Sequence, residues 1–206
     1  MSWHSKTDRF PVQEFIVTPK SPNAIPVADR LGRDVVVQAA LDPAITSIEY
    51  MHALRVGAGS YPFDGIVMVR DGARYAVELG CATPTVRSLD EEGLRLLAFD
   101  TLDAVPGIAL RRDIAREPRC SNARLVWECA GHHVRLQRRL EILDLLDCRG
   151  AMHVGGFGGP REDVFALACD AVVDIDLDAA DIATAEVRRS IGPTAPRPCS
   201  LGGIRA

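Results

Sequence analysis

Apolar and polar residues along this chain repeat with two periods, that of helices and that of strands. Four segments carry apolar residues at helical spacing and are predicted as helices, namely 27–41, 89–103, 134–148 and 162–171. Five segments rich in β-branched and apolar residues are predicted as strands, namely 45–56, 61–69, 75–80, 108–110 and 172–177. Helices that alternate with strands in this way predict an α/β fold.

The clearest local signal is a hairpin near the middle of the chain. The apolar run 61–69 is followed by Asp71-Gly72 and by the returning run 75–80. Asp-Gly between two such runs strongly favours a hairpin turn. Asp64 opens the first strand and Glu78 lies in the second, so we expect both carboxylates at one sheet edge, on the same side of the sheet.

Composition shifts divide the chain into four parts. Residues 1–26 hold several prolines and predict an extended N-terminal arm. Residues 27–128 contain the alternating elements and predict the core. Residues 129–189 give helix, glycine-rich turn, helix and strand, an order that resembles a winged helix. Residues 190–206 are rich in Pro and Gly and predict a flexible tail.

Composition and charge bear on which partners this chain is expected to bind. The chain has 206 residues, and the hydrophobic share of 47% is ordinary for a globular protein. The net charge of −4 argues against nonspecific nucleic-acid binding, which usually needs a basic surface. Arginines nevertheless gather in two groups, which form either a solvated helix face or phosphate contacts: Arg111, Arg112, Arg116, Arg119 and Arg124, then Arg135, Arg138 and Arg139.

Three further features bear on the compartment. None of the six cysteines forms a pair at two-residue spacing, the N-terminus lacks the apolar run of a signal peptide, and no apolar run reaches the ~18 residues of a membrane helix. We therefore expect reduced thiols, a cytoplasmic location and no membrane partner.

Four motifs stand in an order that is typical of one nuclease family. They are Ala40-Leu41-Asp42-Pro43-Ala44-Ile45-Thr46-Ser47-Ile48, Pro62-Phe63-Asp64, Glu78-Leu79-Gly80 and Arg116-Glu117-Pro118-Arg119. Together they resemble the helix exit, the Pro-x-Asp strand, the Glu-x-Lys strand and the linker of TnsA-type transposon endonucleases, which belong to the PD-(D/E)XK nuclease superfamily. The resemblance covers residues 27–178. It implies a restriction-endonuclease-like core, a mixed sheet flanked by helices, with a small winged-helix-like C-terminal domain.

The resemblance also implies a chemistry for the hairpin. In that family two carboxylates hold Mg²⁺ against the scissile phosphate through hard oxygen ligands. The ion lowers the pKa of the attacking water, and a lysine on the second strand orients that water. Carried over to this chain, the resemblance makes Asp64 and Glu78 the catalytic residues and metal ligands.

Two groups that the family would place beside them are missing. The lysine position is Gly80, and the helix glutamate falls near Gly32. Asp29 and Asp34 are close enough that a shift of one helical turn could bring either toward the site. The resemblance with these losses favours a TnsA-like protein of a mobile element that acts with a transposase on DNA and has lost its own cutting activity.

Two other functions stay open. The chain is alternatively an active Mg-dependent endonuclease that cuts DNA at element ends, with a displaced group from Arg74 or Arg87, although arginine stays protonated and is a poor base. The third interpretation is a non-enzymatic adaptor or regulator that reuses the fold.

The second helix of the C-terminal unit predicts what that unit contacts. It carries Glu162, Asp163 and Asp170 among apolar residues. A helix that reads bases in the major groove normally presents Arg, Lys, Asn or Gln. We therefore expect this unit to contact protein, such as a partner transposase, and expect any DNA affinity to come from the two arginine groups.

Overall fold

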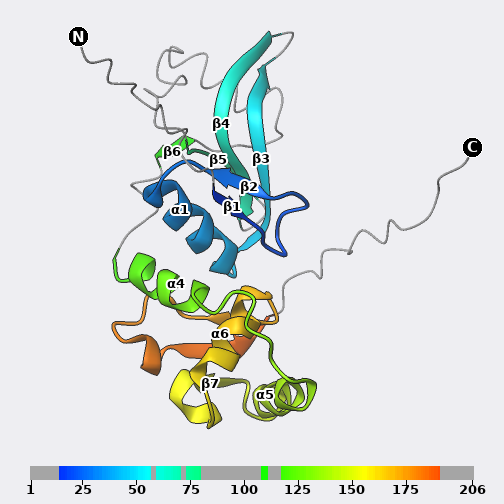
Figure 1. Ribbon diagram of the computed structural model, residues 1–206, viewed down its shortest axis with the longest axis vertical. Helices are drawn as coiled ribbons and strands as arrows, with labels where there is room; N and C mark the ends of the chain where they lie inside the picture. The colour runs from blue at the N-terminus through cyan, green and yellow to red at the C-terminus, as the bar shows by residue number, and fades with distance from the viewer. Residues whose placement is uncertain (1–13, 57–58, 71–72, 80–107, 111–116, 191–206) are drawn as a thin grey trace, which may run out of the picture.

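The computed structural model describes residues 14–56, 59–70, 73–79, 108–110 and 117–190 (Figure 1), and only the backbone of 53–56, 59–62, 73–76, 78 and 108–110. Several predicted features lie outside these ranges: residues 1–13 of the arm, the helix at 89–103, Gly80, Arg87, the arginines of 111–116 and the tail from 191 onward.

The described part of the chain has the predicted α/β class. Its helices are α1 (Arg30–Leu41), α4 (Arg119–Trp127), α5 (Leu136–Arg149) and α6 (Arg161–Cys169), with short 3-10 turns η2 (Val154–Phe157) and η3 (Ile182–Thr184). Its strands are β1 (Glu14–Ile16), β2 (Ile25–Val27), β3 (Ile45–Val56), β4 (Gly59–Arg70), β5 (Ala73–Glu78), β6 (Ile108–Leu110), β7 (Ala151–His153), β8 (Val173–Ile175) and β9 (Glu186–Arg189).

The central sheet has the order β3-β4-β5-β6 and contains the predicted hairpin as β4 and β5. β3, β4 and β5 are antiparallel, and β6 joins β5 in parallel. β4 pairs with β5 only from Gly65 onward, so the far ends of β3 and β4 form a two-stranded ribbon that projects from the body (Figure 1). The core lies between this sheet and α1, where Val35 and Val36 are fully buried together with Ile48 and Ile66.

The described part of the expected N-terminal arm is a short hairpin of β1 and β2. Ile16 and Ile25 are buried in the same core as α1. The loop between the two strands reaches β3, because the backbone N–H of Ile48 donates to the carbonyl oxygen of Lys20 at 2.8 Å. Residues 14–26 are therefore fastened to the central unit.

The C-terminal unit combines α5 and α6 with a small antiparallel sheet of order β7-β9-β8. The helices predicted at 134–148 and 162–171 are present as α5 and α6, and the strand predicted at 172–177 is present as β8. Every residue of α6 from Val164 to Cys169 is buried. α4 lies between α1 and α6 (Figure 1) and joins the two halves of the chain.

Candidate functional site

Asp64 lies on β4, where the third strand of the sheet begins to pair, and its side chain is exposed. The hydroxyl of Tyr50, on the neighbouring strand β3, donates a hydrogen bond of 2.6 Å to Asp64 Oδ1. Burial raises the pKa of Tyr50, and the hydrogen bond and charge of Asp64 raise it further. Tyr50 is therefore neutral and donates a hydrogen bond to one carboxylate oxygen of Asp64.

The backbone register gives the position of Glu78 relative to Asp64. Glu78 stands opposite Gly65, and the next residue, Leu79, donates its N–H to the Asp64 carbonyl oxygen at 2.7 Å. The two carboxylate-bearing positions are thus neighbours at the same end of the β4–β5 ladder. Directly paired positions share a face of a sheet and successive positions alternate, so this register puts the Glu78 position on the face of Gly65 rather than on that of Asp64. The backbone therefore argues against the same-side placement that we expected. The structure describes only the backbone of Glu78, and the sharing of one ion stays a prediction.

The acidic residues near the start of α1 have other partners. Asp29 caps the helix by accepting the N–H of Gly32 at 2.7 Å, as short side chains at this position commonly do. Asp34 is buried and holds Arg124 of α4 through two bonds, from Nε at 2.8 Å and from Nη2 at 2.5 Å. Both Asp34 oxygens are therefore engaged at α4 and do not serve the Asp64 site.

The fit of a divalent ion can be tested on these donors. One oxygen of Asp64 accepts from Tyr50, and Asp34 is fully paired with Arg124. Among the residues whose side chains are described, no three His, Cys, Asp or Glu gather closely enough to hold a metal. Mg²⁺ prefers several hard oxygen ligands in near-octahedral geometry. The described side chains alone do not supply such a set of ligands, and the side chain of Glu78 is not among them.

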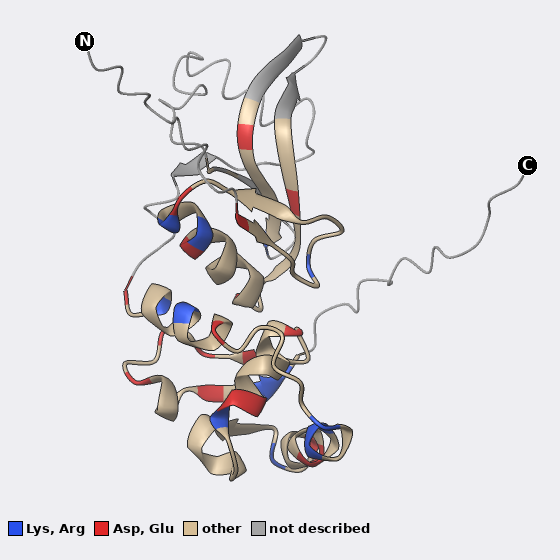
Figure 2. Cartoon of the chain, viewed as in Figure 1, with Lys and Arg blue, Asp and Glu red and all other residues tan. Residues whose placement is uncertain are grey.

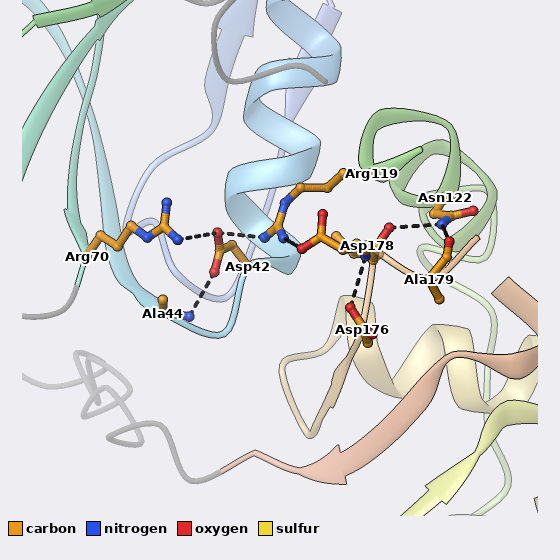
Figure 3. Close-up of polar contacts among 9 residues, drawn as sticks. Asp42, Ala44, Arg70, Arg119, Asn122, Asp176, Asp178 and Ala179 are labelled. Atoms are coloured by element: carbon orange, nitrogen blue, oxygen red, sulfur yellow. Dashed lines mark hydrogen bonds and ion pairs between the residues drawn. The ribbon is translucent and has the colours of Figure 1, made fainter. Parts of the chain in front are cut away.

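A second polar cluster lies where the central unit meets the C-terminal unit, and Figure 3 shows its contacts. Asp42 is buried at the end of α1 and accepts a hydrogen bond from the N–H of Ala44 at 2.9 Å. It also forms an ion pair with Arg119 at 2.7 Å. Arg119 also pairs with Asp178 at 2.6 Å, beyond β8. Arg70 approaches Asp42 at 4.0 Å from β4.

The same face of α4 makes a further contact across this boundary. The Asn122 amide nitrogen, buried, donates to the carbonyl oxygens of Leu177 at 2.9 Å and of Ala179 at 2.7 Å. We call Asp34, Asp42, Arg119, Asn122 and Arg124 the seam. The seam fixes α4 to both halves of the chain.

The seam changes the interpretation of the arginine groups. Arg119 and Arg124 pair with buried aspartates, so neither forms a solvated face or a free phosphate contact. Arg138 of the second group pairs with Asp163 at 3.5 Å and donates to the carbonyl oxygens of Phe157 and Gly158, which holds the glycine turn against α5. Our expectation that these three arginines supply DNA affinity finds no support in their contacts.

Lys20, in the β1–β2 loop, contacts the seam at Asp42. Its Nζ donates to the carbonyl oxygen of Asp42 at 2.5 Å. Burial lowers the pKa of Lys20 to about 8, against the opposing pull of Asp42 and Asp174. Burial likewise raises the pKa of Asp174. Both shifts have the same cause, which is that this boundary is poorly solvated.

The lowered pKa of Lys20 predicts how stability depends on pH. Between about pH 8 and 10.5 the unfolded chain holds the lysine proton more tightly than the folded chain, so this residue's contribution to stability rises with pH. We expect the stability difference between wild type and Lys20→Met to move in favour of wild type by roughly 2 kcal/mol across that range. Urea unfolding at several pH values measures it, and a difference that stays flat would contradict it.

Charge and helix length bear on the expected partners. Figure 2 shows basic and acidic residues mixed along the described chain. Within the described ranges, every helix is too short or too polar to span a bilayer.

The comparisons with known proteins leave the family open. No protein-family model matches this chain, and no curated protein matches it either. The class that is established is therefore an α/β protein with a mixed central sheet and a C-terminal unit of helices and a small antiparallel sheet.

Proposed function

We propose that this chain is a TnsA-like, nuclease-fold protein of a mobile genetic element that acts beside a transposase on DNA in the cytoplasm and does not cut DNA itself. The observation that carries the loss of cutting is the Tyr50–Asp64 hydrogen bond of 2.6 Å. It engages the residue that would be the first metal ligand with a neutral donor from the same chain.

The arrangement of the central unit supports the nuclease-like part of the proposal. A helix that ends at Asp42-Pro43 leads into β3, and the β4–β5 hairpin then brings the Asp64 and Glu78 positions next to each other. This is the element order that the resemblance implies for a restriction-endonuclease-like core. A fold by itself does not determine a function, so the residues of the hairpin carry the argument.

The C-terminal unit supports a role in protein contact. The order α5, β7, α6, β8, β9, with β9 paired to both other strands, agrees with a winged-helix-like domain. The helix of such a domain that would enter a major groove is α6, and its residues 164–169 are all buried. α6 packs against α4 and α5 of the same chain, so base reading by α6 would require the unit to open.

The cutting activity is tested with the purified full chain on supercoiled plasmid in Mg²⁺ or Mn²⁺. We expect the plasmid to stay supercoiled. Gly80→Lys alone should leave it intact too, because the helix position near Gly32 also lacks a carboxylate. Nicking that disappears in both Asp64→Ala and Glu78→Ala would establish the active endonuclease instead.

The mobile-element part of the proposal has a separate test. We expect a transposase to be encoded beside this chain and to co-purify with it when the two are expressed together. A neighbourhood without a transposase, or a neighbouring transposase that does not bind, would remove this part and leave the adaptor or regulator.

A further inference from the structure

Tyr50 is held in place from more than one side. Its β-register partner on β4 is Ile66, a fully buried core residue, and its own ring is half-buried against that core. The His52 ring meets the Tyr50 ring edge-on, with centroids 4.7 Å apart and planes at 86°. These contacts already orient the hydroxyl toward Asp64. The Tyr50 side chain therefore loses little further rotamer freedom when it forms the hydrogen bond.

The bond itself is of a strong type. Hydrogen bonds from a hydroxyl to a carboxylate typically measure 2.5–2.7 Å and are about twice as strong as those between neutral groups. The Tyr50–Asp64 distance of 2.6 Å lies in that range. A divalent cation that bound Asp64 through this oxygen would first have to displace the hydroxyl.

We propose that Tyr50 is a positioning residue that holds Oδ1 of Asp64 as a hydrogen-bond acceptor and so weakens the binding of a divalent cation by Asp64. This inference rests on the proposed function, since it explains how a nuclease-like hairpin can keep its first acidic residue without an ion. Asp64 then has a structural role, because its hydrogen bond with Tyr50 links β4 to β3 at the point where β5 begins to pair.

The test is a titration of the full chain with Mn²⁺. Binding is measured by calorimetry or from the electron paramagnetic resonance signal of free Mn²⁺. We expect Tyr50→Phe, which removes only the hydroxyl, to bind Mn²⁺ about tenfold to a hundredfold more tightly than wild type, as the loss of one hydrogen bond to a charged group would give. The double variant Tyr50→Phe/Asp64→Asn should return to the wild-type affinity.

Each result decides the inference. Equal Mn²⁺ affinity of Tyr50→Phe and wild type would overturn it, and so would a gain that survives in the double variant. Tyr50→Leu provides a second way to remove the hydroxyl if the phenylalanine variant folds poorly, with folding checked by circular dichroism.

This inference and the proposed function fail in different ways. Nicking by wild type, or the lack of a transposase partner, counts against the proposed function whatever the Mn²⁺ titration gives. An unchanged Mn²⁺ affinity on a protein that does not nick counts only against the role of Tyr50.

Discussion

Arg124→Ala should lower the free energy of unfolding by about 3–5 kcal/mol, the usual cost of removing one partner from a buried ion pair. Asp34 is only 2% exposed, and Arg124 supplies both of the hydrogen bonds that its oxygens accept at α4. Without the guanidinium, Asp34 stays buried either as an uncompensated charge or as a neutral acid without its donors. The hydrogen bonds that Arg124 donates to Asp34 also raise the pKa of Arg124, so the guanidinium stays charged over the whole practical pH range.

The measurement is urea denaturation, in which the midpoint should fall while the slope stays constant. Arg188→Ala is the matched control, because Arg188 is 67% exposed and pairs with Glu186 at the surface, where such pairs contribute about 1 kcal/mol or less. Asp34→Leu/Arg124→Met should recover much of the loss, since apolar residues of similar size can replace a buried pair. Equal effects of Arg124→Ala and Arg188→Ala would contradict the importance of this contact.

Gly65→Ala should destabilise the fold by about 3 kcal/mol, at the upper end of the usual cost of overpacking. A Cβ atom added at Gly65 would lie 2.2 Å from the carbonyl oxygen of Val77 and 2.6 Å from the Phe63 ring. The nearest atom belongs to the backbone of β5 and cannot rotate away, so the β4–β5 ladder itself would have to shift. This ladder positions Asp64 and Glu78, and the variant therefore disturbs the candidate site as well.

The matched control for this variant is Gly155→Ala. A Cβ at Gly155 would meet only the Ala183 carbonyl oxygen at 3.7 Å, an ordinary contact. We expect that variant to be neutral or slightly stabilising, because alanine reduces the freedom of the unfolded chain. Thermal unfolding of both variants checks the pair, and a Gly65→Ala protein as stable as wild type would show that the strands can separate at this point without cost.

Sequence pattern was sufficient for elements whose signals are local. The β4–β5 hairpin follows from Asp71-Gly72 between two apolar runs, and α5 from its leucine spacing. α4 was not predicted, because Pro118 and several arginines concealed a short buried row of Cys120, Ala123 and Val126 at three-residue spacing. That row was the signal that could have revealed it.

Other short elements had no sufficient local signal. β1 and β2 lie in a proline-containing stretch that resembles a loop, and their pairing buries Ile16 and Ile25 only because α1 and β3 cover them. β7 and β9 are three and four residues long. β7 becomes a strand only by pairing with β9, more than thirty residues away, and β9 pairs with both β7 and β8.

The sequence by itself determined the α/β class, the central hairpin and the positions of two carboxylates on it, because these depend on neighbours within a few residues. Only the tertiary structure decided what each polar residue does. Asp34 meets Arg124 from ninety positions away, and Asp42 meets Arg119 from the start of the same helix α4, which makes both aspartates parts of the seam. Tyr50 meets Asp64 across two strands. A charge is a ligand, a cap or a buried ion-pair partner according to the groups that surround it in space, and periodicity along the chain carries no information about those groups.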